Sequence, residues 1–340
     1  MRDCLESISH AQSLYKASSY RDSLRICETI YITRPSDPDT LVLLGAIHFQ
    51  LRNLSECIFY SQQCLRVDET CAEAYVTIGN CMREMGKLDA AVGFFHKAIR
   101  FQPRFPDAYN NLACTLFKLG KVNEAIETLN VAITLNGSHC DAICNLANVY
   151  KVIGKPNDAK NKYLDAIRID PKCAIAWSNL GGIFYDNGDF EQAVKCYRHA
   201  LAISPDFADA SSNMGNAFMR LGKQLEDNNH FHEAKKQYQR AQEIRPDFAL
   251  AVGNMGLLEM IHGNNVEQLS CSKKAEHLLR KALLHDPNYY DALNNLAIHY
   301  FEQRQFDESI KLCLRALKHK PDHYYVYHNL AKALKAKVKY

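Results

Sequence analysis

The sequence predicts an all-α fold in which one helix pair is repeated along the chain, forming a right-handed superhelical solenoid of about nine and a half repeats. Three observations predict it. Segments align without gaps at a period of 34 residues, small residues recur at fixed places in each period, and Gly and Pro recur where helices have to end. Together they assign residues 1–340 to a single repeat array.

The period sets the repeat boundaries. Counted as position 1, the repeats start at Cys4, Pro38, Ala72, Pro106, Cys140, Ala174, Ala208, Ala249, Tyr290 and Tyr324. The spacing is 34 except in repeats 208–248 and 249–289, which carry seven extra residues around Lys223–Asn229 and Asn264–Ser270. About one extra turn in each helix would absorb the insertion as a longer hairpin. The alternative is a protrusion that contacts a partner.

Residue size within the period explains how each helix pair packs. Position 8 is Gly or Ala in every repeat and position 20 is Ala, Ser or Cys, so the two helices can approach closely. Bulky residues occupy positions 4, 7, 11 and 24, for example Trp177, Leu180, Phe184 and Tyr197. Gly is frequent at position 15, where the first helix should stop and turn, and Pro at position 32, where the second helix should end. This pattern resembles the tetratricopeptide repeat.

Composition excludes several classes of protein. Lys and Arg number 41 against 38 Asp and Glu, so no net charge favours nucleic acid or an anionic membrane as a partner. The basic run Lys332–Lys339 is interpreted as a solvated helix face. No apolar stretch is long enough to span a membrane, and residues 1–10 lack the features of a secretory signal. Thirteen cysteines without CxxC pairs predict free thiols in a reducing compartment, the cytoplasm or nucleus.

One face of the first helices carries a column of asparagines at position 6. Its members are Asn111, Asn145, Asn179, Asn213, Asn254, Asn295 and Asn329. By helical phase, positions 2, 6, 9 and 13 lie opposite the core positions, where a superhelix would have its concave groove. A carboxamide donates and accepts at once, so such a column could pair with the main chain of an extended peptide. Asn could also simply be common in this repeat class.

Position 2 is often acidic. Asp39, Glu73, Asp107, Asp141, Asp209 and Asp291 occupy it, and Asp107, Asp141, Asp209 and Asp291 are candidates for selecting side chains of a bound peptide. A favourable charge in the first helical turn explains them equally well.

Three stretches carry a closer resemblance. They are PDFADASSNMGNA in Pro205–Ala217, AIAWSNLGGIF in Ala174–Phe184 and LGAIHFQ in 44–50. They resemble the repeat region of nucleocytoplasmic O-GlcNAc transferases, in register over roughly Pro35 to Phe218. The resemblance implies that the asparagine column holds the acceptor backbone and that groove aspartates bias side-chain choice. It also implies that a nucleotide sugar would be bound by a catalytic domain absent from this chain, which needs no cofactor of its own.

The chain departs from that family in places. Position 6 is Leu43 and Thr77 in two early repeats, and position 2 is Ile175, Leu250 and Tyr325 in three others. The 41-residue repeats are similar to those of Spindly-type O-fucosyltransferases, which leaves GlcNAc and fucose both open as the sugar. The stretch that pairs subunits in the O-GlcNAc transferases corresponds to Asp189–Gln192, which is largely polar, so a homodimer is not carried over.

Motifs of other functional classes are missing from the sequence. The sequence contains no HExxH, GxSxG or Walker motif, so we expect no catalytic residues in the chain. His230 and His232 lack a third metal ligand, and no metal site is predicted. Position 5 is never Lys or Arg from Val76 to His328, which disfavours an adaptor that grips C-terminal carboxylates. An assembly scaffold unconnected to glycosylation remains the alternative.

Overall fold

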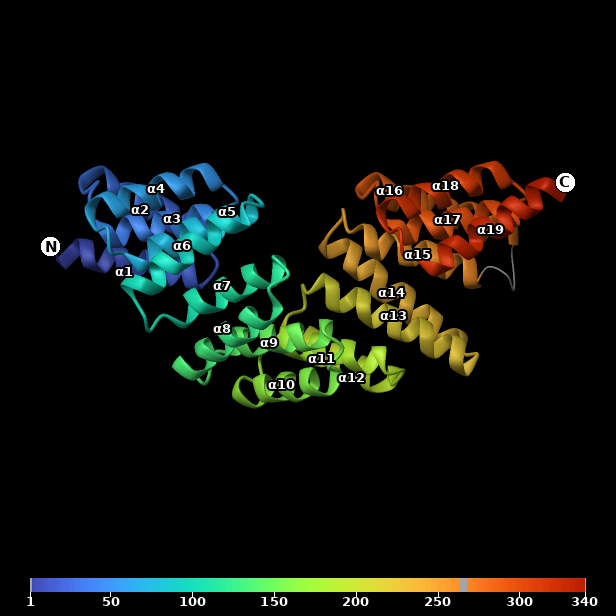
Figure 1. Ribbon diagram of the computed structural model, residues 1–340, viewed down its shortest axis with the longest axis horizontal. Helices are drawn as coiled ribbons and strands as arrows, with labels where there is room; N and C mark the ends of the chain where they lie inside the picture. Colours follow the sequence, from blue (N-terminus) through green and yellow to red (C-terminus); the bar gives the residue numbers. More distant parts are fainter. Residues whose placement is uncertain (1, 263–267, 340) are drawn as a thin grey trace. The chain divides into compact units, whose positions relative to one another are not determined.

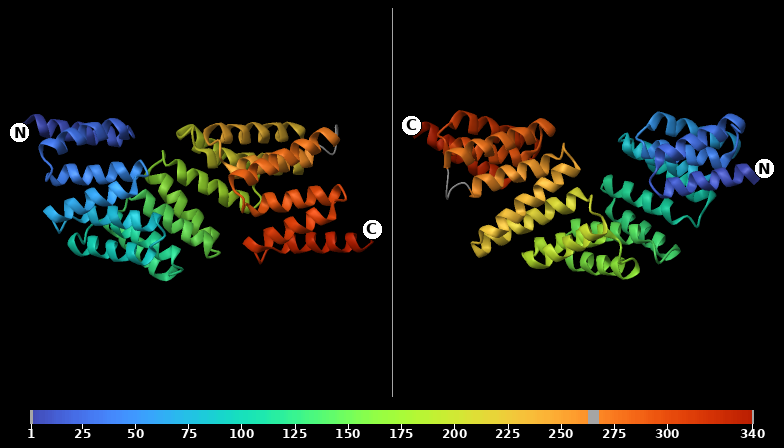
Figure 2. Two further views of the ribbon diagram at one scale, coloured as in Figure 1. Left: turned by 90° about the horizontal axis from the view of Figure 1, so that it is seen from above. Right: turned by 180° about the vertical axis from the view of Figure 1, so that it is seen from behind.

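The structure is a computed structural model, which describes residues 2–262 and 268–339. Every secondary-structure element in these ranges is an α-helix, so the predicted fold class is confirmed. The chain divides into two compact units, Met1–Asp170 and Pro171–Tyr340. In each unit successive helices run back and forth as stacked pairs (Figures 1 and 2).

Unit 1 contains five helix pairs, in which the first helix of each pair is odd-numbered. They are α1 (Arg2–Lys16) and α2 (Tyr20–Thr33), α3 (Pro38–Gln50) and α4 (Leu54–Val67), α5 (Ala72–Glu84) and α6 (Leu88–Phe101), α7 (Pro106–Lys118) and α8 (Val122–Leu135), and α9 (Cys140–Val152) and α10 (Pro156–Ile169).

Unit 2 contains four further pairs and a final first helix. They are α11 (Ala174–Asp186) and α12 (Phe190–Ile203), α13 (Ala208–Leu225) and α14 (Asn228–Ile244), α15 (Ala249–His262) and α16 (Gln268–His285), α17 (Tyr290–Glu302) and α18 (Phe306–His319), and α19 (Tyr324–Lys339). From α3 onward, every first helix begins at its predicted position 1.

Position 15 is left-handed in the regular repeats, whatever residue occupies it. Gly86, Gly120, Gly154 and Gly188 have φ between +75° and +82°. Ser18, Arg52 and Arg304 have φ of 61°, 63° and 59° at the same place. The turn is therefore imposed by the packing of the helix pair. Glycine lowers the conformational free energy of this turn, because a residue with a side chain is strained at positive φ.

The prediction of a turn at Gly222 is wrong. Gly222 lies inside α13, which continues to Leu225, and Glu226 takes the left-handed conformation with φ of 52°. The ring of Phe231 packs 3.2 Å from where a Cβ on Gly222 would lie, so the glycine here serves a close contact. Gly263, the corresponding glycine of the next repeat, lies outside the described residues.

The first insertion lengthens the hairpin. Helix α13 has 18 residues where α11 has 13, and α14 has 17 where α12 has 14. The extra residues extend both helices, as the longer-hairpin interpretation requires. In the next repeat α16 has 18 residues, but much of Asn264–Ser270 lies outside the described residues.

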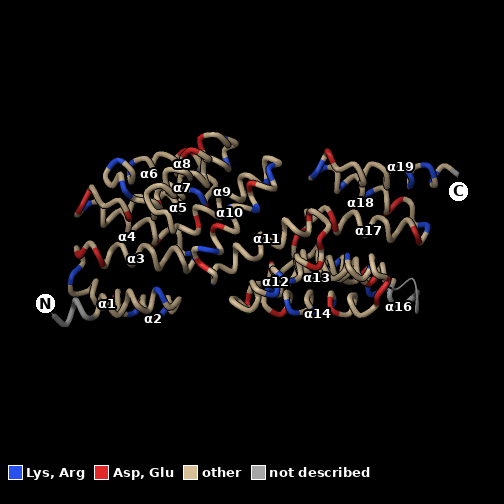
Figure 3. Tube along the Cα trace, turned by 90° about the horizontal axis from the view of Figure 1, so that it is seen from below, with Lys and Arg blue, Asp and Glu red and all other residues tan. Residues whose placement is uncertain are grey.

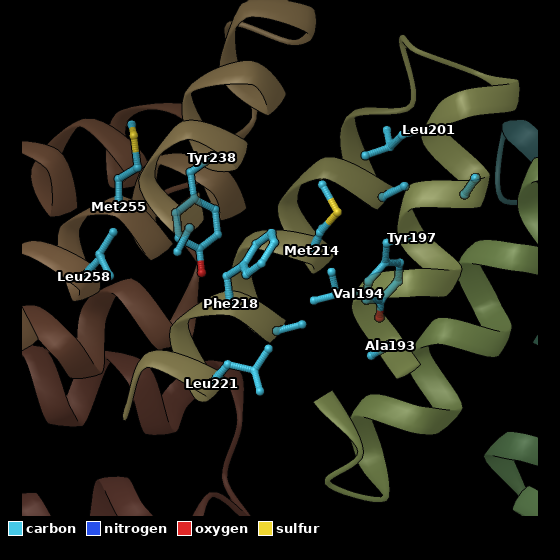
Figure 4. Close-up of a cluster of buried hydrophobic side chains, with 14 residues drawn as sticks. Ala193, Val194, Tyr197, Leu201, Met214, Phe218, Leu221, Tyr238, Met255 and Leu258 are labelled. Carbon is cyan, nitrogen blue, oxygen red and sulfur yellow. The ribbon is translucent and has the colours of Figure 1, made fainter. Parts of the chain in front are cut away.

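The core of each repeat is closed by contact between positions 8 and 24. A Cβ on Gly79, Gly181 or Gly215 would lie within 2.8 Å of the ring of Phe95, Tyr197 or Tyr238. Figure 4 shows Tyr197 and Tyr238 with Met214, Phe218 and Leu258 in the largest buried cluster of unit 2. Where position 20 is Ser, its hydroxyl donates to the position-8 carbonyl, as in Ser309 to Ala297 at 2.8 Å.

Cysteines fill small sites in this core. No disulfide joins any of the eleven cysteines whose side chains the structure describes. Cys57 and Cys81 are fully buried, with sulfur atoms 3.1 Å apart. None of the described helices is long and apolar enough to cross a membrane.

Candidate functional site

The seven asparagines of the column lie one on each first helix from α7 to α19, and all seven are half-buried. Asn111 and Asn145 belong to unit 1, and the other five belong to unit 2. Because these side chains are half-buried, each packs against neighbouring residues of the array and is still partly exposed at the surface. This set of residues is called the asparagine column below.

Amide-to-amide hydrogen bonds connect the column to the preceding repeat. Asn145 Nδ2 donates to Asn110 Oδ1, Asn254 Nδ2 to Asn216 Oδ1, and Asn329 Nδ2 to Asn294 Oδ1, each at 2.9 Å. Each bond uses one N–H of the column residue. The second N–H and the carboxamide oxygen remain available, because an asparagine side chain has two donors and an acceptor.

The acceptors of these bonds are themselves held in place. Asn216 Oδ1 also accepts a 2.7 Å hydrogen bond from the hydroxyl of Tyr238, which is fully buried at position 24. Burial raises the pKa of Tyr238 well above its ordinary value, so the hydroxyl stays protonated and remains a donor. Tyr163 donates in the same way to Asn148 Oδ1 at 2.5 Å. The core thereby fixes the orientation of amides next to the column.

The repeats of α3 and α5 carry no asparagine at position 6. Leu43 is buried at position 6 of α3, and Thr77 in α5 bonds its hydroxyl back to the carbonyl of Glu73 at 2.9 Å. Neither side chain offers a carboxamide. At the next repeat Asn111 Oδ1 accepts a 3.4 Å hydrogen bond from Arg83 Nη1. The column therefore starts at α7.

Three of the four candidate aspartates already face basic side chains of their own repeat. Asp209 pairs with Arg245 at 2.8 Å, and Asp107 pairs with His139 Nε2 at 3.2 Å. Burial raises the pKa of Asp291, and the neighbouring His323 and Lys320 oppose that shift. Asp141 is exposed. His139 and His323 are the last residues of their repeats, and Arg245 lies three residues before the end of its repeat.

Asp107 and Asp141 come together at one place in unit 1. They line a cavity of about 340 Å³ with Asn136, Ser138 and His139. His139 also accepts from the backbone N–H of Ala142 through Nδ1 at 3.3 Å, which caps α9. The histidine is therefore explained by capping α9 and by its Nε2 contact with Asp107.

A metal centre is not formed among the described residues. His230 Nδ1 lies 2.8 Å from Asp227 Oδ2 within its own first helical turn, and His232 is exposed. Within each unit, successive first helices offer amide donors and acceptors, which is the chemistry of main-chain recognition.

Comparison with known proteins agrees with the repeat assignment. Family models described as "Tetratricopeptide repeat" match residues 38–71, 72–105, 94–127, 213–248 and 273–338, and one described as "TPR repeat" matches 181–222. Among solved structures, the APC/C hetero-tetramer Cut9–Hcn1 superposes with a TM-score of 0.63 at 17% identity, covering 96% of this chain and 55% of that chain. A thermophilic TPR protein of Thermus thermophilus reaches 0.50 at 20% identity, covering 57% of this chain and 98% of that chain. These likenesses show the fold.

Two curated relatives are similar over a shorter stretch. The UDP-N-acetylglucosamine–peptide N-acetylglucosaminyltransferase of Caenorhabditis elegans is 34% identical over 84 residues, which are 25% of this chain and 7% of that protein. The probable transferase SEC of Arabidopsis thaliana is 34% identical over 85 residues, which are 25% of this chain and 9% of that protein. The match thus spans less than a tenth of either relative's length.

Proposed function

The chain is a tetratricopeptide-repeat protein, and we propose that it binds extended segments of acceptor proteins along the asparagine column and presents them to an O-linked glycosyltransferase. The amide-to-amide hydrogen bonds are the observation that carries this proposal. They hold Asn145, Asn254 and Asn329 in fixed orientations before any segment binds. Preorganised groups lose little conformational entropy on binding. The second N–H and the carboxamide oxygen of each of these asparagines can therefore bind a peptide main chain at a low entropic cost.

Main-chain recognition suits a protein that handles many targets. Backbone N–H and C=O groups are the same in every segment, so amides that pair with them impose little sequence preference. Each pair should contribute about 0.5–1.5 kcal/mol net. Several pairs acting together then give useful affinity for unrelated sequences. The link to glycosylation rests on the similarity to the two N-acetylglucosaminyltransferases. Fucose stays open as the sugar because the 41-residue repeats are similar to those of Spindly-type O-fucosyltransferases.

The test is a fourfold substitution within unit 2. Asn213, Asn254, Asn295 and Asn329 are changed together to Ala, and binding of a panel of unrelated extended peptides is measured by fluorescence anisotropy. We expect affinity to fall more than tenfold across the whole panel, because about 0.5–1.5 kcal/mol is lost at each position. A matched control changes four exposed asparagines of unit 2, Asn187, Asn228, Asn229 and Asn288, to Ala. It should bind the panel normally.

Stability has to be followed in the same experiment. The fourfold variant removes the hydrogen bonds of Asn254 and Asn329, which should cost about 1 kcal/mol each, while Ala regains part of this as a better helix former. Circular dichroism should therefore show a folded protein with a modestly lower melting temperature. If the folded variant binds the whole panel as tightly as the wild type, the column is not the binding site. An assembly scaffold with partners elsewhere then becomes the better interpretation.

The aspartates separate into two groups in this proposal. Asp209 is already paired with Arg245, so Asp209→Ala should leave peptide preference nearly unchanged. Asp141 is exposed, so Asp141→Ala should weaken peptides that carry Lys or Arg more than neutral ones. If both substitutions weaken the binding of cationic peptides equally, the ion pair between Asp209 and Arg245 does not prevent Asp209 from contacting the bound segment.

A further inference from the structure

A tyrosine in the core of unit 2 is connected to the asparagine column through one intermediate amide. The hydroxyl of Tyr238 in α14 donates to Asn216 Oδ1 in α13 at 2.7 Å, and Asn254 Nδ2 in α15 donates to the same oxygen at 2.9 Å. Tyr238 is fully buried, whereas Asn254 belongs to the column and is half-buried. These three residues, called the Tyr238 network below, therefore connect the core with the column.

The buried hydroxyl decides which way the two amides face. Tyr238 has Asn216 Oδ1 as its acceptor, and a buried donor that loses its acceptor is destabilising. The oxygen of Asn216 is therefore held toward Tyr238, and Asn254 can pair with that oxygen only through an N–H. The carboxamide oxygen of Asn254 and its second N–H then stay available for a bound main chain.

Without this hydroxyl the two amides could exchange their roles. If the side chain of Asn216 turned over, its Nδ2 would donate to Asn254 Oδ1, and one amide-to-amide hydrogen bond would still form. None of residues 210–219 in α13 and 249–258 in α15 is charged, so no charge within these stretches favours either arrangement (Figure 3). The hydroxyl of Tyr238 is the group that distinguishes the two arrangements.

One repeat of unit 1 shows the arrangement that forms when the hydroxyl is missing. Position 24 is Phe95 there, and Asn80 Oδ1 at position 9 is buried without a hydrogen-bond partner among the described residues. In the following repeat, the column residue Asn111 accepts from Arg83 Nη1 at 3.4 Å through its own carboxamide oxygen. The array itself thus engages the acceptor of Asn111, whereas Asn254 contacts the array through an N–H.

We propose that Tyr238 is a positioning residue for main-chain binding, which acts through Asn216 to keep the carboxamide oxygen of Asn254 free for the bound segment. The inference rests on the proposed function and adds a residue of the core to it. Tyr238 does not contact the segment, because its side chain is fully buried. Its effect on binding has to pass through the two amides.

The preceding repeat supplies a matched comparison. Tyr197 occupies position 24 there and is only 2% exposed, but position 9 is Gly182. A hydroxyl is therefore present without a side-chain amide at position 9 that could connect it to the column residue Asn213. Figure 4 shows the rings of Tyr197 and Tyr238 in the same buried cluster. Removing the hydroxyl of Tyr197 should leave the column unaffected.

Thermal unfolding tests the orientation of the amides without any peptide. At neutral pH Asn254→Asp places a carboxylate, which only accepts, against Asn216 Oδ1, so it should lower the melting temperature. Tyr238→Phe allows Asn216 to turn over and donate to that carboxylate, so the double variant should lose less than the sum of the two single changes. Asn213→Asp with Tyr197→Phe is the control, in which the two effects should add. Additive effects in the Tyr238 network as well would overturn the assigned orientation.

Peptide binding tests the functional consequence. Tyr238→Phe should weaken the panel of unrelated extended peptides about two- to fivefold, because only part of the protein then presents the oxygen of Asn254. The variant should stay folded, since Phe95 occupies the same position in unit 1. Tyr197→Phe should bind like the wild type. In an Asn254→Ala background, Tyr238→Phe should weaken binding no further, because the residue through which it acts is gone.

The possible outcomes separate the two proposals. If the wild type and Tyr238→Phe bind the panel equally tightly, Tyr238 is not a positioning residue and the asparagine column stands. If Tyr238→Phe weakens binding by the same factor with and without the carboxamide of Asn254, it acts through packing and the positioning role is overturned. If the wild type binds no peptide, the column fails as a binding site, and the positioning role fails with it whatever the melting temperatures show.

Discussion

Gly181 lies against the ring of Tyr197 so closely that a Cβ built on it would sit 2.8 Å from Cε1. Tyr197 is only 2% exposed and is surrounded by Ala193, Val194 and Leu201, so its ring has little room to withdraw. This contact closes the helix pair α11–α12. It is repeated between Gly79 and Phe95 in unit 1.

The first prediction is that Gly181→Leu overpacks this contact and lowers the free energy of unfolding by about 1–3 kcal/mol. Gly181→Ala should also destabilise, because even one methyl group meets the ring. Gly93 provides the control, since it lies in helix α6 with nothing within 4 Å of its Cβ direction. Gly93→Ala should stabilise by about 0.5–1 kcal/mol through its helix propensity. Thermal melting of all three variants is the measurement, and an unchanged midpoint for Gly181→Leu would contradict the packing.

A second prediction concerns Glu226, which has φ of 52° at the end of α13. Glycine adopts this conformation without strain, so Glu226→Gly should raise stability by about 1 kcal/mol. The converse change is Gly188→Ala, where φ is +82° and nothing lies within 4 Å of an added Cβ. It should lower stability by a similar amount through the backbone alone. Urea unfolding measures both, and a shift of the same sign in the two variants would refute the backbone explanation.

The third prediction is a pH dependence centred on Glu276. Its carboxylate accepts from the Tyr300 hydroxyl at 2.7 Å and from Arg280 Nε at 2.9 Å, and these hydrogen bonds, Tyr300 first, lower the pKa of Glu276 from 4.5. A carboxyl whose pKa is lower in the folded state stabilises the fold above its unfolded pKa, and loses that contribution as pH falls through the folded pKa. Glu276→Gln should therefore melt below the wild type at neutral pH, and the gap should shrink at pH values below about 4.5.

The control for this pH dependence is Glu243→Gln, since Glu243 is an exposed residue of α14. Its melting temperature should follow that of the wild type across the range. A constant gap between wild type and Glu276→Gln from neutral to acid pH would mean that packing, and not ionisation, explains the destabilisation.

The fourth prediction is the order in which the thiols react. The hydrogen bond from Cys64 lowers the pKa of the half-buried Cys71, whereas burial raises the pKa of Cys313 to about 11. The thiolate is the reactive species, so brief alkylation of the native protein at neutral pH should label Cys71 well before Cys313. Peptide mapping by mass spectrometry reads the order. Complete alkylation after denaturation should find thirteen thiols with or without reductant, and a Cys57–Cys81 disulfide would be the first exception to look for.

The starts of the first helices from α3 onward could be predicted because they depend on residue size at fixed spacing. Small residues at positions 8 and 20 and a bulky residue at position 24 leave one way to close each pair, and the odd-numbered helices from α3 to α19 begin where the period places them. The turn at Gly222 could not be predicted, since a glycine that ends a helix and one that accommodates a neighbouring ring look alike in sequence. Only the longer hairpin, with Phe231 against Gly222, distinguishes them.

The sequence predicts which face of the first helices carries the asparagines, but it does not predict their hydrogen-bond partners. Helical phase places the asparagines on one side, and all seven are half-buried there. It does not say that Asn254 reaches back 38 residues to Asn216, because that contact depends on how far one repeat is rotated on the next. The same limit applies to Asp209, whose partner Arg245 lies at the far end of its own repeat.

Some contacts described above lie within one repeat, and others join two neighbouring repeats. The contact of Gly181 with Tyr197 is complete inside one repeat, so duplicating that repeat or deleting a different one would leave the contact intact. The bonds Asn145–Asn110, Asn254–Asn216 and Asn329–Asn294 each join two repeats and need a particular neighbour. Repeats of this chain are thus interchangeable as folding modules but not as parts of the binding surface. Shuffling them would preserve the array and scramble the alignment of its amides.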